Sequence, residues 1–140
     1  MTNEELYAYI AGLIDGEGSV SIIRKSGGHI PMIQLSMRAP AKVPKWLYNT
    51  FGGGYGEYKQ GNHAYGDGYT AKWSLSGYQA LELLSNIRPY IIEKLEVIEL
   101  VLDFPMVGKH HTITPEVLEA RIAIHELVSN LNRKSKLRIF

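Results

Sequence analysis

The sequence predicts an α+β fold in which a helix, two strands, a helix and two more strands are followed by further helices. Residues 18–25 and 30–38 alternate apolar and polar side chains, which is the two-residue period of a half-buried strand. Residues 4–17 and 90–103 instead repeat apolar side chains every three or four positions, as helices do. With 140 residues, 45% of them hydrophobic, and no cysteine, the chain can build one core and forms no disulfide.

The first predicted helix carries two different faces. Its apolar stripe is formed by Leu6, Ile10, Leu13 and Ile14. A separate face holds the short side chains of Ala8, Ala11, Gly12 and Asp15. Glycine inside a helix costs about 1 kcal/mol relative to alanine, so Gly12 predicts a close crossing that a larger side chain would block. Gly16 and Gly18 are predicted to end this helix.

The remaining elements are separated by glycine and proline, which rarely continue a helix or strand. We predict strands at 18–25, 30–38, 55–59 and 69–75, a loop at 60–68, and helices at 43–51, from 76 or 77 to 87, at 90–103 and from Pro115 to about Leu131. Alternation predicts that Val20, Ile22, Ile33, Leu35, Met37, Trp73 and Leu75 face the core.

The end of the first helix carries two carboxylates, Asp15 and Glu17. A carboxylate at the C-terminal end of a helix is electrostatically disfavoured unless a cation lies there. Solvated turn residues are the ordinary alternative for such a pair. The segment Tyr9–Gly18 resembles the LAGLIDADG motif of homing endonucleases, with Ile10 in the position of the leading leucine. Gly16 stands in place of the second alanine and Glu17 in place of the second aspartate.

This resemblance implies an αββαββα homing endonuclease fold over residues 4–103, with a four-stranded antiparallel sheet as a DNA-binding saddle. Residues 104–140 would add a C-terminal helix and a basic tail to a single domain, 1–140. The implied function is a site-specific, metal-dependent endodeoxyribonuclease that makes double-strand breaks in a long, near-palindromic target. Only one motif copy is found in the sequence, so the implied enzyme is a homodimer. Its interface would contain Ala8, Ala11, Gly12 and Asp15, and Asp15 would in addition have a structural role at the helix end.

The resemblance also implies the active-site residues. Glu17 would bind the metal together with the carbonyl oxygen of Gly16, and the ion would be Mg²⁺, with Mn²⁺ or Ca²⁺ able to occupy the same sites. The segment Ile87–Lys94 resembles the family's helix that brings a lysine to the active site, so Lys94 would stabilise the anionic transition state. An ordinary surface lysine is the alternative. Where the family often has a water-ordering glutamine this chain has Met37, and Gln34 or Arg38 could substitute.

The predicted DNA-binding residues lie on the polar side of the strands. Residues 18–75 hold seven lysines and arginines against two acidic side chains, a net charge of +5, although the whole chain is only +1. The strand positions that alternate with the core-facing ones point outward, and we predict that the polar residues there bind DNA. They are Ser19, Ser21, Lys25, Gln34, Ser36, Arg38, Glu57, Lys59, Thr70 and Lys72. A solvated strand position is the alternative for each of them. Tyr55, Tyr58, Tyr65 and Tyr69 are predicted to shield the sheet, with packing on DNA sugars as the alternative.

Other functions are disfavoured. Residues 52–54 lack the lysine and serine or threonine of a phosphate-binding loop, and the histidine spacing favours no metal site. No apolar stretch approaches the length of a membrane span, so we expect a soluble protein of the cytosol, the mitochondrion or the chloroplast, without a membrane partner. Two alternatives on the same fold remain: an intron maturase that binds intron RNA, and a DNA-binding regulator that does not cleave.

Overall fold

The computed structural model describes the main chain of residues 1–59, 68–108 and 111–137, and side chains through residue 134. The elements are α1 (Asn3–Glu17), β1 (Gly18–Lys25), β2 (Gly28–Arg38), α2 (Val43–Phe51), β3 (Gly54–Lys59), β4 (Tyr69–Ser76), α3 (Gly77–Ile87), the 3₁₀ helix η2 (Arg88–Tyr90), α4 (Leu95–Leu102) and α5 (Pro115–Leu137). Most of the predicted loop at 60–68, with Tyr65, lies outside the described residues. The predicted α+β element order is confirmed.

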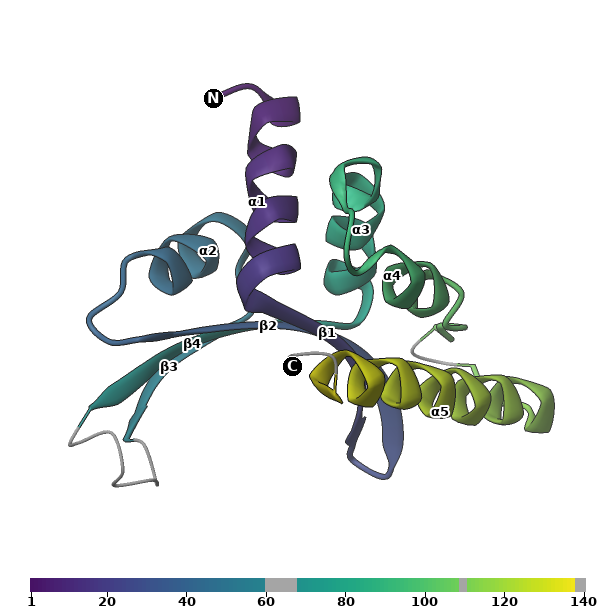
Figure 1. Ribbon diagram of the computed structural model, residues 1–140. Helices are drawn as coiled ribbons and strands as arrows, with labels where there is room; N and C mark the ends of the chain where they lie inside the picture. Colours follow the sequence, from purple (N-terminus) through teal and green to yellow (C-terminus); the bar gives the residue numbers. More distant parts are fainter. Residues whose placement is uncertain (60–67, 109–110, 138–140) are drawn as a thin grey trace.

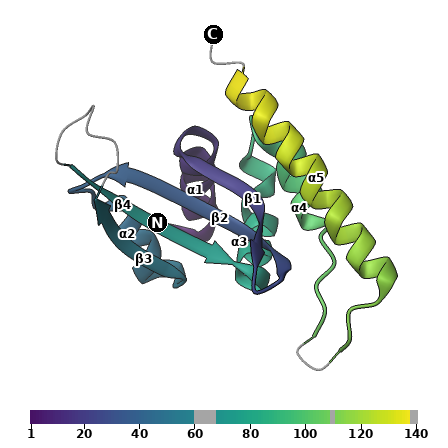
Figure 2. The same ribbon diagram turned by 90° about the horizontal axis from the view of Figure 1, so that it is seen from below.

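The four strands form one antiparallel sheet in the order β1-β2-β4-β3. Figure 1 shows this sheet edge-on as an arch, with α1, α2 and α3 on its upper side and the concave side open below. Figure 2 gives the view of the concave side, and none of the described helices crosses in front of the strands there. One face of the sheet is therefore covered and the other is free to receive a partner, as antiparallel sheets allow.

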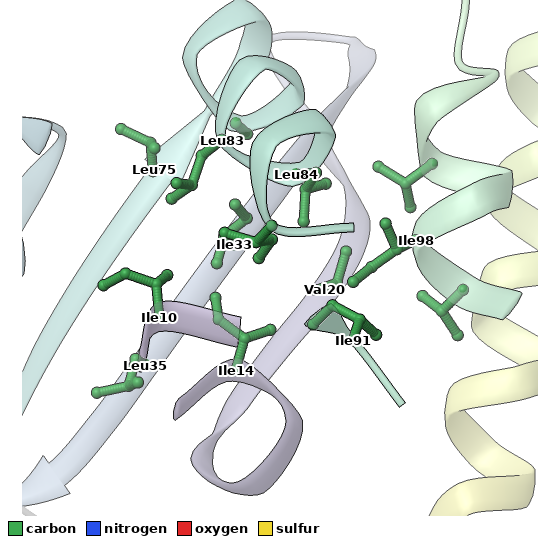
Figure 3. Packing of buried hydrophobic residues seen from close by; sticks show 14 of the residues in the cluster. Ile10, Ile14, Val20, Ile33, Leu35, Leu75, Leu83, Leu84, Ile91 and Ile98 are labelled. Carbon is green, nitrogen blue, oxygen red and sulfur yellow. The ribbon is translucent and has the colours of Figure 1, made fainter. Parts of the chain in front are cut away.

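Burial follows the predicted alternation wherever a strand contains aliphatic residues. Val20 and Ile22 are buried in β1, Ile33 and Leu35 in β2, and Trp73 and Leu75 in β4. Met37 is partly buried against the same core. Figure 3 shows Ile10 and Ile14 of α1 in one cluster with the strand residues Val20, Ile33, Leu35 and Leu75. Leu84 of α3 and Ile98 of α4 belong to the same cluster. Each such aliphatic side chain stabilises the fold by about 1.5–3 kcal/mol on burial.

Strand β3 has the opposite orientation from the one that we predicted. Glu57 lies opposite the buried Ala71, and Lys59 lies opposite Tyr69. Directly paired residues of an antiparallel sheet point to the same side, so Glu57 and Lys59 lie on the helix side. The prediction that they face outward is wrong, because this strand has no aliphatic residues to mark its buried side and its register is set by β4. Gly56 and Tyr58 occupy the open face instead.

Helix boundaries differ from the prediction at three points. Helix α1 continues through Gly16 to Glu17, and Gly18 is its C-cap. Helix α4 begins at Leu95 rather than at residue 90, because η2 and an extended turn come first. Helix α5 runs to Leu137, beyond the predicted end at Leu131. The turn before α4 is the important difference, since it carries Lys94.

Helix α5 lies alongside the edge strand β1, next to α4, in both views (Figures 1 and 2). Its Val128 is buried in the common core, and its Asn132 side chain donates a hydrogen bond of 3.1 Å to the carbonyl of Val20. Arg121 is 8% exposed, donates to the carbonyl of Pro105 at 2.9 Å and packs over Phe104. The helix thus covers a strand edge that would otherwise be open to pairing with another chain.

Candidate functional site

Glu17 occupies the junction where α1 ends and β1 begins. Its side chain is exposed, and the next residue, Gly18, donates its N–H to the carbonyls of Ile14 and Leu13. A Cβ atom on Gly18 would lie 2.9 Å from the Cα of Ile14, so only glycine fits at this turn. Gly16 is exposed, and nothing comes within 4 Å of the position of its missing Cβ. The local sequence therefore presents Glu17 to solvent directly beside the open face of the sheet.

Asp15, two residues before Glu17, faces the interior of the subunit. Its carboxylate accepts hydrogen bonds from the backbone N–H groups of Ile92, at 2.7 Å, and of Lys94, at 3.1 Å. These N–H groups belong to the extended turn that precedes α4. A long-range contact of this kind has no signal in local periodicity, which explains why α4 was predicted to begin too early.

Lys94 reaches the same helix end. Its Nζ donates to the carbonyl oxygen of Asp15 at 2.8 Å, and the residue is half-buried. The last carbonyls of a helix lack partners within the helix and carry partial negative charge, so an ammonium group there is favourable. The structure therefore brings Lys94 to the end of α1 that carries Gly16 and Glu17.

The predicted interface face of α1 is only partly exposed. Ala8 and Gly12 are exposed, and no other segment of the described residues lies within 4 Å of a Cβ built on Gly12. Ala11, by contrast, is fully buried with Ile10 and Ile14, and Asp15 is bonded to the turn before α4. Ala11 and Asp15 are therefore packed within their own subunit, and their place at a dimer interface stays a prediction. Residue size indicated close packing correctly, but it did not indicate whether the neighbour belongs to the same subunit.

The open face of the sheet carries most of the predicted DNA-binding residues, which lie side by side on neighbouring strands. Gln34 lies between Ser19 and Ser74, Ser36 lies beside Lys72, and Arg38 lies beside Thr70. Lys25 and Ser21 extend the same face along β1. Among the described strand residues, this face holds the cations of Lys25, Arg38 and Lys72 and no carboxylate. Such a surface attracts a polyanion.

Tyr58, one of the tyrosines predicted to shield the sheet or to pack on DNA sugars, lies on the open face. It lies opposite Thr70 and is 58% exposed. Its ring folds over Gly56, since a Cβ there would come within 2.7 Å of the Tyr58 hydroxyl. Tyr55 does shield the covered side of the sheet, where its ring is 6.1 Å from that of Tyr48 and 4.7 Å from the Lys45 ammonium. The glycine two residues before Tyr58 was the only signal in the sequence for its placement.

The two proposed substitutes for a water-ordering glutamine occupy different rows. Gln34 is paired with Ser19, two residues after Glu17, and its Nε2 lies 3.1 Å from the sulfur of Met32. The last β1–β2 pair joins Gly18 to Leu35, so Ser36 is the open-face residue next to the Glu17 junction. Arg38 lies one row farther along β2. Met37 itself packs on the core side and is not available to the open face.

No histidine-based metal centre is found within the described part of the chain, where no three His, Cys, Asp or Glu side chains come together. His29 and His125 nevertheless contact each other across β2 and α5, with ring centroids 4.8 Å apart. Burial, followed by the charges of His125, Arg24 and Arg121, lowers the pKa of His29. The pair was missed because its members are 96 positions apart in the sequence, which gives no local pattern. Within the described residues, no helix is both long and apolar enough to cross a membrane.

Comparison by sequence identifies no relative: no protein-family model matches, and no curated protein is significantly similar. Comparison of the fold gives a different result. I-CvuI, a homing endonuclease solved with its target in the presence of calcium, matches with a TM-score of 0.63 at 14% identity. The match covers 92% of this chain and 83% of I-CvuI.

Two further solved structures extend this likeness. The archaeal intron-encoded homing endonuclease I-Vdi141I, complexed with DNA, has a TM-score of 0.58 at 16% identity over 92% of this chain and 85% of its own. The LAGLIDADG meganuclease I-AabMI, bound to uncleaved DNA, has a TM-score of 0.63 at 12% identity. That match covers 85% of this chain but only 43% of I-AabMI. At these identities the likeness establishes the fold.

Proposed function

Since the chain has the fold of the LAGLIDADG homing endonucleases, we propose that it is a site-specific DNA endonuclease that acts as a homodimer on a long, near-palindromic target. The observation that carries this proposal is the position of Glu17. Its exposed carboxylate lies at the end of α1, where the cationic open face of the sheet begins. A duplex bound along that face would bring its phosphates to this carboxylate.

Glu17 and the carbonyl of Gly16 are the proposed ligands of a divalent cation, Mg²⁺ or, in its place, Mn²⁺ or Ca²⁺. Both groups are exposed oxygen donors, which suit these hard cations. Two donors do not complete a coordination shell of six, so DNA phosphates, water and the second subunit would supply the rest. When bound, the ion would supply an activated water and stabilise the leaving oxygen. The presence of calcium with I-CvuI and its target is consistent with this assignment.

Lys94 is the proposed catalytic cation. Its ammonium is already held at the end of α1 by the carbonyl of Asp15, at 2.8 Å. A positive charge fixed there would favour the extra negative charge that a phosphate gains in the transition state. Because the position is set before DNA binds, little reorganisation would be needed during the reaction.

The proposed homodimer is supported by chain length and by the surface of α1. This chain covers most of I-CvuI but less than half of I-AabMI, so the longer protein has room for two such units. The motif occurs once here. Exposed Ala8 and Gly12 would let the α1 helices of two subunits approach closely, with one Glu17 for each DNA strand.

DNA recognition is proposed for the open-face residues, which are Ser19, Ser21, Lys25, Gln34, Ser36, Arg38, Thr70 and Lys72. Tyr58 joins them, whereas Glu57 and Lys59 lie on the helix side. Exposed Arg133 and Lys134 of α5 would contact phosphates. The side chains of Lys136 and Arg138 in the basic tail lie outside the described residues. We propose that residues 104–140 form one domain with the core at 4–103.

Cleavage of a randomised palindromic DNA pool in Mg²⁺, followed by sequencing of the new ends, tests this function. We expect cuts enriched at one near-palindromic sequence, and we expect Glu17→Gln to abolish them. Glu116→Gln is the matched control, because Glu116 is exposed at the start of α5, far along the chain from the junction. Binding without cleavage in Mg²⁺ or Mn²⁺ would instead support the regulator, and preference for intron RNA would support the maturase.

A further inference from the structure

Asp15 accepts three hydrogen bonds from the turn before α4, two through its carboxylate and one through its carbonyl oxygen. We propose that Asp15 is a positioning residue, which fixes the turn before α4 so that the Lys94 ammonium is held beside the Glu17 junction. This inference rests on the proposed endonuclease function, because it concerns the placement of the catalytic lysine. In this role Asp15 affects the reaction without contacting DNA or the metal ion.

The first step of the argument concerns the backbone. The N–H groups just before and at the start of a helix have no partner within that helix. Asp15 supplies the partners from another helix: Oδ2 accepts from Ile92 N at 2.7 Å, and Oδ1 accepts from Lys94 N at 3.1 Å. Both carboxylate oxygens therefore accept a hydrogen bond. The two donors, Ile92 and Lys94, follow Asp15 by 77 and 79 positions in the sequence. Lys94, the N-cap of α4, is fixed through its own main chain.

The second step concerns side-chain burial in the same turn. Ile91 is 6% exposed and anchors one end of the segment in the core. Ile92 is 82% exposed, however, and Glu93 is also exposed. Apolar burial therefore does not hold the segment from Ile92 to Lys94 in place. Instead, two hydrogen bonds to the Asp15 carboxylate and one from the Lys94 ammonium to the Asp15 carbonyl connect this segment to α1.

The third step concerns the lysine side chain. Its Nζ donates to the main-chain carbonyl of Asp15 at 2.8 Å, so backbone and side chain of Lys94 are tied to one residue. Asp15 lies in the last turn of α1, and Glu17 ends that helix two residues later. A shift of the turn would move the ammonium relative to Glu17 while leaving the open face of the sheet unchanged. Asp15 would thus affect the rate of cleavage and not the affinity for DNA.

Asp15→Asn is the direct test, because asparagine keeps the size of the side chain but replaces one acceptor by an N–H₂ donor. That donor would face the backbone N–H of Ile92 or Lys94. We expect single-turnover cleavage of the pool-selected target in Mg²⁺ to slow by about 10- to 100-fold, as misplacement near 1 Å commonly does. DNA affinity measured in Ca²⁺ should change less than twofold. Asp103→Asn, an exposed carboxylate at the C-cap of α4, is the matched control and should cleave at the wild-type rate.

A double-mutant cycle with Lys94→Met separates positioning from a merely structural role. If Asp15 acts through Lys94, Asp15→Asn should not slow cleavage further in the Lys94→Met background, although it should lower the melting temperature in both backgrounds. Equal slowing in both backgrounds would overturn the proposal. Wild-type cleavage by Lys94→Met would overturn it too, while leaving the endonuclease function intact. Failure of the wild-type protein to cleave any DNA would refute the function itself and this inference with it.

A measurement without DNA covers the case in which Asp15→Asn folds poorly. Reductive methylation of the free protein, read by mass spectrometry, reports how accessible the Lys94 amine is, with the amine of Lys72 as internal reference. Asp15→Glu keeps both carboxylate oxygens but displaces them by one methylene. We expect faster methylation of Lys94 in this variant than in wild type and unchanged methylation of Lys72. Unchanged methylation of Lys94 would mean that Asp15 does not hold its ammonium.

Discussion

Gly18 determines whether Glu17 can be presented at all. The strand begins directly at the C-cap of α1, and the missing side chain of Gly18 leaves room for the backbone of Ile14, 2.9 Å from the position of a Cβ. Neighbouring backbone cannot yield as a flexible side chain would. The motif's final glycine is therefore a packing requirement of the helix-to-strand junction, independent of any metal.

Gly18→Ala should destabilise the fold by about 1–3 kcal/mol, because overpacking against backbone forces the helix end and the strand apart. Chemical denaturation followed by circular dichroism measures this directly. Gly16→Ala is the control, since Gly16 lies inside α1 with open space around its Cβ position and should gain up to about 1 kcal/mol. Equal stability of Gly18→Ala and wild type would contradict the close packing at this junction.

Among the elements, α5 is the one whose attachment should respond to pH. Its His125 contacts His29 of β2, and the Nδ1 of His29 is buried and has no hydrogen-bond partner among the described atoms. Arg24 of β1 and Arg121 of α5 add positive charge to the same cluster. Burial, then His125 and the two arginines, lowers the pKa of His29 below its ordinary value of 6.5. The neutral form is therefore the one that the folded protein prefers.

The free energy of unfolding should consequently be highest above pH 6.5 and should fall as the pH decreases toward 5. The sign follows because the unfolded chain binds a proton at His29 more readily than the folded one. Denaturation curves between pH 5 and pH 8 measure the slope. His125→Gln should flatten it, whereas His111→Gln, an exposed loop residue, should not. A steeper slope in His125→Gln would contradict the proposed repulsion.

The helices and strands also show where sequence patterns are enough to predict orientation and boundaries. Strands β1, β2 and β4 were placed with the correct faces, because aliphatic residues at every second position leave one way to bury them. The predicted orientation of β3 was the reverse of the observed one. Glycine, tyrosine and charged residues are compatible with either face of the sheet, so the pairing with β4 sets the register. The start of α4 was missed because Asp15, far away in sequence, caps the turn before it. Glu17 and Lys94 were selected through the resemblance of their local motifs, and their roles stay predictions.

The corrected orientation of β3 predicts which lysines the DNA meets. Lys72 lies on the open face beside Ser36, whereas Lys59 lies on the helix side. Lys72→Gln should reduce the slope of log affinity against log salt concentration by about 1, the value for one lost phosphate contact. Lys59→Gln is the matched control and should change the slope much less. Fluorescence anisotropy across a salt series measures both, and equal effects would contradict the register of β3.

At the scale of the whole molecule, α1 stands on the outer side of the arched sheet (Figure 1). Its exposed Ala8 and Gly12 suit association with a second copy. Gly12→Leu should leave the subunit folded, because none of the other described segments comes within 4 Å of the Cβ position. It should nevertheless block dimer formation, which sedimentation velocity would detect as a shift to monomer. Ala123→Leu, at an exposed position of α5, is the control and should remain dimeric. A monomeric wild-type protein would contradict the proposed assembly.

Cleavage of a supercoiled plasmid that carries the selected target gives the most direct test that Glu17 serves as the metal-binding carboxylate of a paired active site. In Mg²⁺ the wild-type protein should convert this plasmid to the linear form, because one Glu17 would act on each strand. Glu17→Gln should leave the plasmid supercoiled while binding the target in Ca²⁺ within about tenfold of wild type, the loss expected from one weakened ligand. Linearisation by Glu17→Gln at the wild-type rate would contradict the assignment of Glu17.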